Sequence, residues 1–404
     1  MAKAVFMLLV PVVLALGLTQ PMWGQVPEKR FITNDGKRPT GLFAPGVMVG
    51  KTLYVAGKGD YRPNEEFPGK VKNCLAEIEK TLKQAGLGFE HVVKSFVYLE
   101  DHDKYDDLNK YYGDFFPKNP PARTTLGVAQ VPGESRLEIT CIAYADLAQR
   151  KAIGQQPMGR PYSPGILAGD TLYVSGKGDQ LPSGAHPATF EEQVRQCMKN
   201  VEATLKEAGL DFRNVVMSHV FLDDAKNFGP AASVYDEFFA DGAEPACATT
   251  LVDWIPGGSH VEVTCIATTD LATRKVVRPA SIHAAGWPVK ASAGVWAGNT
   301  LYLSGLAGTQ DGKLAAGLDA QVHQMAKNHT AVLDAAGLSL EDIVSGHVYL
   351  TDMQDYNGMN AIYRQYFSKG PGVRTTLMPS TGSGNSEARV IASFIAAKTQ
   401  PAKP

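Results

Sequence analysis

The chain has 404 residues, a formal net charge of -2, 44% hydrophobic residues and 20% charged residues. This is the composition of an ordinary globular protein. A near-neutral charge excludes the strongly basic surface that nucleic-acid-binding proteins carry, so we expect no RNA or DNA partner.

Residues 1–25 are typical of a secretory signal. Lys3 precedes an apolar run at 5–18, and small and polar residues follow it. An uncleaved membrane anchor is the alternative, but the run is short for a bilayer span and Pro11 interrupts it. We expect export to the periplasm or the exterior, with no membrane attachment after cleavage.

Beyond this segment, three motifs recur in the same order. They are TLYVAGKGD at 52–60, TLYVSGKGD at 171–179 and TLYLSGLAG at 300–308; AGLGFEHVVKSFVYLED at 85–101, AGLDFRNVVMSHVFLDD at 208–224 and AGLSLEDIVSGHVYLTD at 336–352; PPARTTL at 120–126, PACATTL at 245–251 and PGVRTTL at 371–377. The copies lie too far apart for a solenoid, whose repeat is roughly 20–50 residues. We predict three domains, at 40–148, 161–272 and 288–397, with polar linkers at 149–160 and 273–288.

The first copy predicts the element order ββαβαββ. Apolar stretches at 47–49 and 53–57 flank Gly50-Lys51, a pair suited to a hairpin turn with positive φ. Apolar residues at helical spacing over 71–85 predict a helix that ends at Gly86. The remaining elements are a strand at 92–99, a helix at 105–116, and strands at 124–129 and 137–144.

The strands indicate that each sheet is buried on both faces. Right-handed connections place both helices on one face, yet strands such as LYVAG are apolar at nearly every position. We therefore predict an α+β protein whose three sheets pack face to face around a central axis. The chain would be its own trimer, and a monomer in solution.

These motifs resemble the RidA/YjgF family of enamine/imine deaminases, also called the endoribonuclease L-PSP family. The resemblance implies three tandem chorismate-mutase-like domains that form an intramolecular pseudo-trimer, with ligand clefts between neighbours. It also implies hydrolysis of small 2-imino or enamine carboxylates to 2-oxo acids and ammonia. No metal or other cofactor is expected, because such substrates are already electrophilic.

The family's carboxylate-binding arginine is the one in its PARTT motif. It corresponds to Arg123 in the first copy and Arg374 in the third. A guanidinium suits this role because its planar donors match a carboxylate. Alignment on the TT pair places Ala248 there in the second copy, so we expect that cleft to be inactive.

The family's acidic residue positions or activates the hydrolytic water. The resemblance assigns it to Glu138 in LEITCIA and to Glu262 in VEVTCIA. In the third copy we assign Glu387, by aligning VIA of the last strand with CIA of the first copy. Counting from the TT pair places Arg389 there instead.

Other cleft residues follow from the same resemblance. They are the tyrosine of RPYSPG, Tyr162, replaced by Phe43 and Ala291 in the other copies; the helix asparagines Asn109 and Asn360, replaced by Ala232 in the second copy; and the glycines Gly57, Gly176 and Gly305, whose backbone approaches the ligand. In the family, Arg and Glu come from one subunit and Tyr from its neighbour. The ring direction then decides whether Tyr162 meets Arg123 or Arg374.

Structural explanations remain open for the same residues. Arg123 and Glu138 are equally explained as a cross-strand ion pair, the cleft tyrosine as a packed ring, and the asparagines as surface residues. His219 and His347 share a strand position with Phe96, which favours packed neutral histidines. Four of the five cysteines occupy equivalent positions in two copies, which favours free buried thiols over disulfides.

Two functions compete at this stage. One is an exported deaminase; the other is a non-catalytic module with degenerate clefts that binds carboxylates or a protein partner. Ribonuclease activity is the weakest alternative, because no basic groove is evident.

Overall fold

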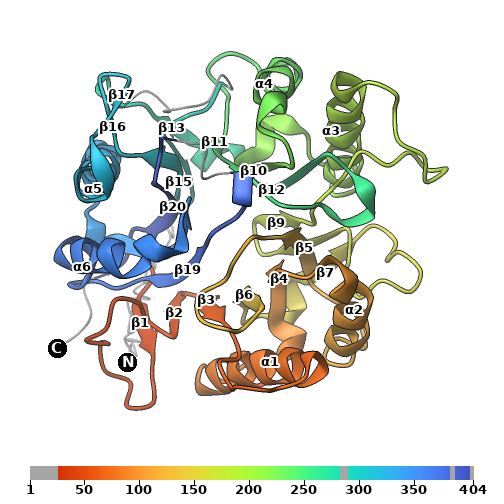
Figure 1. Ribbon diagram of the computed structural model, residues 1–404, viewed down its shortest axis with the longest axis horizontal. Helices are drawn as coiled ribbons and strands as arrows, with labels where there is room; N and C mark the ends of the chain where they lie inside the picture. The colour runs from red at the N-terminus through yellow and green to blue at the C-terminus, as the bar shows by residue number, and fades with distance from the viewer. Residues whose placement is uncertain (1–25, 283–289, 383–386, 401–404) are drawn as a thin grey trace, which may run out of the picture.

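The computed structural model describes residues 26–282, 290–382 and 387–400. The predicted signal at 1–25 and the predicted start of the third domain at 288 lie outside these residues. Figure 1 views the chain along its shortest axis, with strands gathered toward the middle and helices at the periphery.

The three domains repeat one element order. Domain 1 contains β1 (Lys29–Ile32), β2 (Gly46–Val49), β3 (Thr52–Lys58), α1 (Phe67–Gln84), β4 (Val92–Leu99), α2 (Tyr105–Gly113), β5 (Ala122–Gly127) and β6 (Leu137–Tyr144). Domain 2 contains β7 (Arg150–Ile153), β8 (Gly165–Ala168), β9 (Thr171–Val174), α3 (Phe190–Glu207), β10 (Val215–Leu222), α4 (Phe228–Tyr235), β11 (Ala246–Leu251) and β12 (Val261–Thr268). Domain 3 contains β13 (Lys275–Val277), β14 (Gly294–Ala297), β15 (Thr300–Ala307), the short pair β16 (Thr309–Gln310) and β17 (Lys313–Leu314), α5 (Gly317–Ala335), β18 (Ile343–Leu350), α6 (Tyr356–Phe367), β19 (Val373–Leu377) and β20 (Val390–Ala397).

Each domain builds a six-stranded mixed sheet. The order in domain 1 is β1-β2-β3-β6-β4-β5, and the other two domains repeat it. Only the β4–β5 pair and its counterparts are parallel. The predicted ββαβαββ order is confirmed, but the predicted linkers are partly wrong: β7 and β13 lie inside them and begin the next sheet.

Glycines close the β-hairpins and end the first helix of each domain. Gly50 has φ 55°, and its counterparts Gly169 and Gly298 have φ 55° and 56°. Gly86, just after α1, has φ 76°. A side chain is strained at such angles, so the sequence fixes these turns locally.

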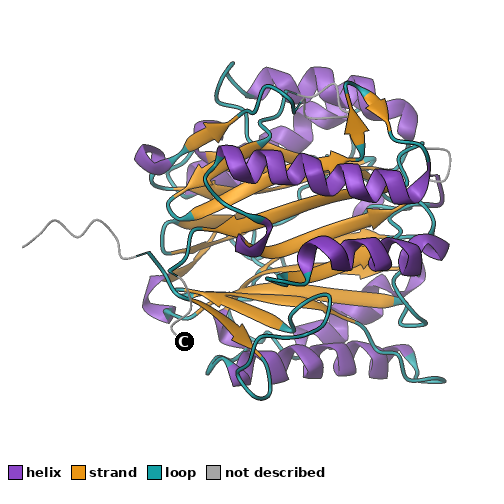
Figure 2. Cartoon of the chain, turned by 90° about the vertical axis from the view of Figure 1, so that its left-hand side faces the viewer, coloured by secondary structure: helices purple, strands orange, loops and turns teal. Residues whose placement is uncertain are grey.

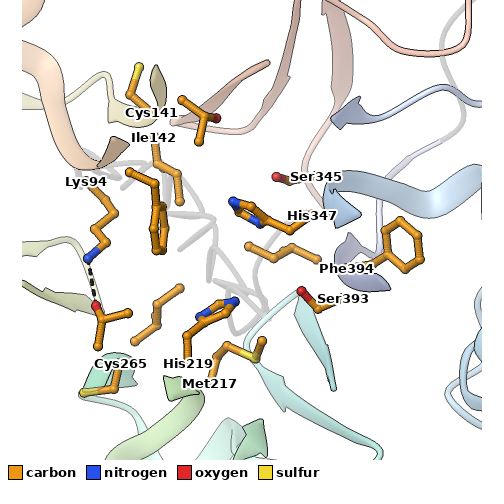
Figure 3. A pocket seen from close by; sticks show the side chains of 15 residues that line it. Lys94, Cys141, Ile142, Met217, His219, Cys265, Ser345, His347, Ser393 and Phe394 are labelled. Carbon is orange, nitrogen blue, oxygen red and sulfur yellow. Dashed lines mark hydrogen bonds between the residues drawn. The ribbon is translucent and has the colours of Figure 1, made fainter. Parts of the chain in front are cut away.

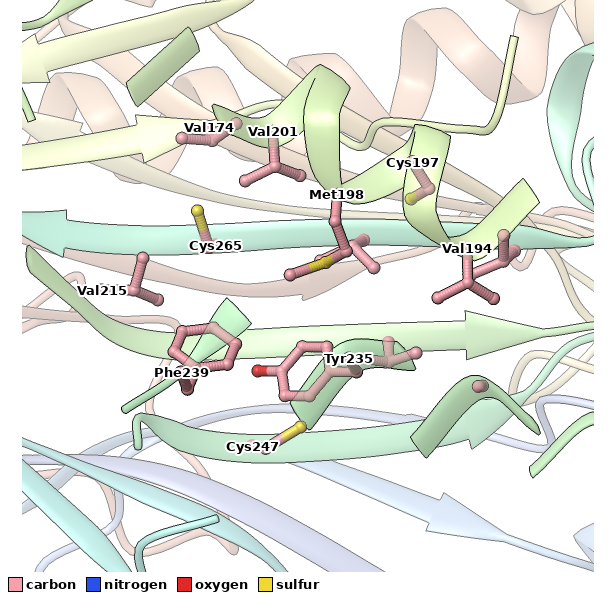
Figure 4. Close-up of a cluster of buried hydrophobic side chains, with 14 of the residues drawn as sticks. Val174, Val194, Cys197, Met198, Val201, Val215, Tyr235, Phe239, Cys247 and Cys265 are labelled. Atoms are coloured by element: carbon pink, nitrogen blue, oxygen red, sulfur yellow. The ribbon is translucent and has the colours of Figure 1, made fainter. Parts of the chain in front are cut away.

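The outer face of each sheet is covered by its own two helices. In domain 2, the apolar stripe of α3, including Val194, Met198 and Val201, packs onto the sheet beside Tyr235 of α4 (Figure 4). The five cysteines of the chain are free and buried. This confirms the prediction of free thiols.

The inner faces pack against one another. One buried cluster draws on all three sheets, with Tyr54, Tyr173 and Tyr302 at equivalent positions of β3, β9 and β15. In Figure 2 the sheets form the interior and the helices the outer layer. The chain therefore folds as the predicted face-to-face arrangement of three tandem α+β domains.

Candidate functional site

The three domain junctions share a backbone framework. At each junction a backbone N–H group of one domain donates to a carbonyl of the preceding domain, just before that domain's last-but-one strand. These hydrogen bonds run from Ser163 to Pro121 at 3.0 Å, from Ser292 to Pro245 at 2.9 Å, and from Ala44 to Gly372 at 3.0 Å. Domain 1 thus contacts domain 2, domain 2 contacts domain 3, and domain 3 contacts domain 1. This closes the ring and fixes its direction.

The junction of domains 1 and 2 holds a buried arginine. Arg123, on β5, is 3% exposed. Its Nη2 donates to Asn109 Oδ1 at 2.5 Å, and its Cζ lies 5.0 Å from the ring centre of Tyr112 and 5.2 Å from that of Tyr162. Its Nη1 and the Asn109 Nδ2 are buried and have no hydrogen-bond partner in the part of the chain that the structure describes. Unpaired buried donors are costly, so two together indicate a place for an acceptor ligand.

The carboxylate at this junction comes from domain 2. Glu262, on β12, lies against Gly176; a Cβ at that glycine would be 1.8 Å from Glu262 Oε1. Burial raises the pKa of Glu262 to about 8, against the opposing effects of Lys94, Arg123 and Lys177. We call Arg123, Asn109, Tyr162, Gly176 and Glu262 the 1/2 site.

The junction of domains 3 and 1 holds the second arginine in a different setting. Arg374, on β19, is 4% exposed, and its Cζ lies 5.3 Å from the ring centre of Phe43, 5.9 Å from Tyr356 and 4.9 Å from Tyr363. In the described part of the chain its guanidinium makes no hydrogen bond or ion pair. Its Nη1 and the Oδ1 of Asn360 are both buried without a partner.

The carboxylate facing this arginine comes from domain 1. Glu138, on β6, lies against Gly57, where a Cβ would be 1.8 Å from its Oε1. Burial raises its pKa to about 8, and Arg374 and then Lys58 oppose the rise. We call Arg374, Asn360, Phe43, Gly57 and Glu138 the 3/1 site.

The two sites divide their residues between domains differently from the expectation. Arginine and asparagine come from one domain; glutamate, glycine and the aromatic residue come from the next. Tyr162 meets Arg123, and Arg123 faces Glu262 rather than Glu138. Neither Glu262 nor Glu138 has a hydrogen bond or ion pair among the described residues.

The junction of domains 2 and 3 has lost the arginine, but not to the residue expected. In the strand register Ser95 pairs with Arg123, and its equivalent Ser218 pairs with Cys247. The position therefore belongs to Cys247, and the assignment to Ala248 is wrong by one residue. The copies align without a gap as PARTTLGV at 121–128 and PACATTLV at 245–252. In this alignment the TT pair of the second copy lies one residue later than that of the first.

The glutamate assigned to the third copy is also wrong. Tyr98 pairs with Glu138, and its equivalent Tyr349 pairs with Ile391. Ile391 thus occupies the glutamate position, while Glu387 is exposed in the loop before β20. At Gly305 an added Cβ would be 3.5 Å from the Ile391 side chain, so this junction is apolar and closely packed.

Two alternatives fail on the same geometry. Arg389 forms an ion pair at 2.5 Å with Asp355 of its own domain. Arg123 and Glu138 do not form a cross-strand pair, because β4 lies between their strands. The arginines are therefore not accounted for by pairing within their own sheets.

A small cavity of about 40 Å³ lies where the three sheets meet (Figure 3). Phe96, His219 and His347 line it from equivalent positions, and burial lowers the pKa of His219 well below its usual value and that of His347 to about 4. Both histidines are neutral packed residues, as expected. Lys94 Nζ donates to Thr264 Oγ1 at 2.8 Å, and burial lowers its pKa to about 7.

Sequence reasoning missed the helix tyrosines and Lys94. Tyr112 and Tyr363 stack on the two arginines, and Tyr235 holds the same position in domain 2. Their presence in every copy was a usable signal. Lys94 occurs in one copy only, and nothing local indicates that it reaches domain 2.

Two features are absent from the described residues. No group of three or more His, Cys, Asp or Glu side chains is arranged to hold a metal ion. None of the helices combines the length and apolar character needed to cross a bilayer.

Comparison with known proteins places these junctions in context. The endoribonuclease L-PSP family model matches residues 35–145, 154–269 and 287–379. A 2-iminobutanoate/2-iminopropanoate deaminase of Rattus norvegicus is 39% identical over 26% of this chain and 78% of its own length. A RutC family protein of Sulfurisphaera tokodaii is 34% identical over 27% of this chain and 93% of its own. A chorismatase structure covers 77% of this chain and 94% of its own at 12% identity with a TM-score of 0.54, which shows a shared fold.

Proposed function

We propose, from the premise that the chain belongs to the endoribonuclease L-PSP (RidA/YjgF) family in three tandem copies, that it hydrolyses small 2-imino carboxylates at the 1/2 and 3/1 sites. Family relatives include 2-iminobutanoate/2-iminopropanoate deaminases. One observation carries the proposal. In two of the three junctions a buried arginine with an unpaired N–H faces a buried carboxyl group from the next domain, and the two form no ion pair.

The arginine supplies the anchor for the substrate. The unpaired Nη1 of Arg123 or Arg374 would donate to the substrate carboxylate, and Asn109 Nδ2 adds a second donor at the 1/2 site. Charge-assisted hydrogen bonds in a buried setting are strong and directional. The imine carbon is thereby held between the arginine and the glutamate of the neighbouring domain.

The glutamate supplies the proton transfers. A carboxyl group with a pKa of about 8 can exchange protons near neutral pH. As the carboxylate it would take a proton from a water that attacks the imine carbon and pass it to the imine nitrogen, which gives the 2-amino-2-hydroxy carboxylate. It would then carry the hydroxyl proton of this adduct to the amine, so that the C=O bond forms as the C–N bond breaks. The products are a 2-oxo acid and ammonia, and no electrons are exchanged with a cofactor.

The test is release of ammonia from freshly generated 2-iminopropanoate by the purified mature chain. We expect acceleration over buffer, and its loss in the R123A/R374A double variant. A rate no greater than that in buffer at any protein concentration would refute the proposal.

A second candidate is carboxylate binding without turnover. The loss of arginine and glutamate from the 2/3 junction, and the phenylalanine at position 43, favour it. Calorimetry that detects carboxylate binding by a preparation with no deaminase activity would identify this case.

We further propose that the chain is exported and acts as a monomer. The composition of residues 1–25 supports export, and the closed ring of three domains supports a self-contained pseudo-trimer. Fractionation would test the first, because the mature protein should lack the signal. Sizing would test the second, and elution as a trimer of chains would contradict it.

A further inference from the structure

The 3/1 site is distinguished by its aromatic border. In the part of the chain that the structure describes, five large apolar side chains are exposed, among them Phe43 at 40% and Tyr61 at 58%. Phe43 lies directly over Arg374. Exposed rings beside a buried, unpaired cation are typical of a ligand-binding surface rather than of ordinary protein surface.

Tyr61 belongs to the same border. It follows Gly57 by four residues, and its ring covers Gly133, where an added Cβ would be 2.7 Å away. Burial raises its pKa, and the nearby Glu138 and the Tyr356 phenol of domain 3 raise it further. Its Cζ lies 3.2 Å from the place where a Cβ of Gly59 would stand, two residues after Gly57 of the 3/1 site.

The border of the 1/2 site has one ring where the 3/1 site has two, because Tyr162 stands at the position of Phe43 but Tyr61 has no aromatic counterpart. Gln180 replaces Tyr61, and its Nε2 donates to Gly257 O at 2.9 Å. Arg160 stands where domain 1 has Gly41, and its guanidinium lies 3.6 Å from Asp106. Beyond Tyr162, the border of this site thus offers hydrogen bonds and charges.

The hydrogen bonding of the two buried arginines also differs. Asn109 Oδ1 accepts from Arg123, whereas within the described ranges Asn360 Oδ1 has no partner and the Arg374 guanidinium makes no hydrogen bond. Three rings surround Arg374, while its in-plane N–H groups remain for an acceptor.

We propose, resting on the proposed function, that the 3/1 site takes 2-imino carboxylates with an aromatic side chain, whereas the 1/2 site takes small ones. The ligand ring packs on Phe43 and Tyr61, and its carboxylate binds Arg374. The chain then serves two substrate classes with one chemistry.

Calorimetric titration of the full mature chain with phenylacetate and propionate tests this directly. R374A should abolish phenylacetate binding and R123A should leave it intact. Y61Q, which installs the residue of the equivalent position, should weaken phenylacetate by about fivefold through loss of one ring contact. L147Q, which removes an exposed apolar side chain elsewhere, is the matched control and should change nothing.

Two outcomes overturn the inference: phenylacetate binding that depends on Arg123, or equal phenylacetate affinity in Y61Q and the unaltered chain. If R374A fails to fold, R374K takes its place. Lysine keeps the charge but lacks the planar guanidinium, so the affinity for phenylacetate should fall by roughly tenfold. Binding needs no turnover, so the two proposals fail separately. Selective binding without ammonia release refutes only the proposed function, and ammonia release with unselective binding refutes only this inference.

Discussion

The 1/2 and 3/1 sites have the same plan and different surroundings. Both place an arginine on the last-but-one strand of one domain against a glutamate of the next, each carboxyl with a pKa of about 8. In the 1/2 site Asn109 accepts a hydrogen bond from Arg123, whereas among the described residues Arg374 makes no hydrogen bond and has three aromatic rings around it. The arginine and glutamate are thus the same in both sites, while the residues around them differ.

The junction of domains 2 and 3, the 2/3 junction, shows which contacts the assembly of the domains requires. Its backbone hydrogen bonds match those of the other two junctions, yet Cys247 and Ile391 replace the charged pair. The framework therefore does not require the charges for assembly. This strengthens the case that the two remaining pairs are kept for a ligand.

The largest expected effect comes from the glutamates. In an R374A background, where only the 1/2 site is intact, E262Q should lower turnover by about 10²–10⁴-fold, because general acid–base catalysis is lost. E138Q in the same background should have no effect, since Glu138 serves the other site. Deaminase rates of the four combinations check this, and equal losses from both substitutions would contradict the assignment.

The arginines should have the next largest effect. R123A should raise KM for small substrates by roughly 10–100-fold, as expected for loss of charge-assisted hydrogen bonds. C247R offers a complementary test. It restores an arginine opposite Ile391, where no carboxylate stands, and should give no third active site in steady-state kinetics.

Alanine substitutions of the junction glycines should affect activity at one junction and only stability at another. G176A places a Cβ 1.8 Å from Glu262 Oε1, so the carboxyl group must move and activity at the 1/2 site should fall by at least about tenfold. G305A places a Cβ 3.2 Å from the Ala248 Cβ and 3.5 Å from the Ile391 side chain, and it meets no carboxylate there. It should cost about 1 kcal/mol of unfolding free energy and leave turnover unchanged, which thermal unfolding and rate assays together can verify.

The smallest effect is a shift in pH dependence. Activity should rise with pH through about 8, because the ionised carboxylate takes the proton from water. Lys94 lowers the pKa of Glu262, so K94M should move the rise at the 1/2 site to higher pH. The pH profile of the 3/1 site, measured in an R123A background, is the internal control, since Arg374 and Lys58 are the charges that act on Glu138.

The fold was predictable from the sequence because its signals are local. Apolar spacing and the glycines after helices and in hairpins define elements of each copy without reference to the others. The glutamate and arginine of the first copy were predictable for the same reason, since their motifs match the family closely.

The errors arose where alignment depended on one short motif. A displaced TT pair pointed to Ala248 instead of Cys247, and a VIA tripeptide pointed to Glu387 instead of Ile391. Strand pairing resolves both, because a register fixes every position along a strand at once. The pairing of Arg123 with Glu262 was not predictable from either motif, since it depends on the direction of the ring.

Lys94 shows what a single chain permits on an axis of near-symmetry. In a true homotrimer every residue beside the axis appears three times, so a lysine there would confront two copies of itself in a dry interior. Here the equivalent positions are Met217 and Ser345. The single Lys94 Nζ donates to hydroxyl and carbonyl oxygens of two domains. Covalent fusion thus allows a single lysine at the centre, whereas exact threefold symmetry would require three.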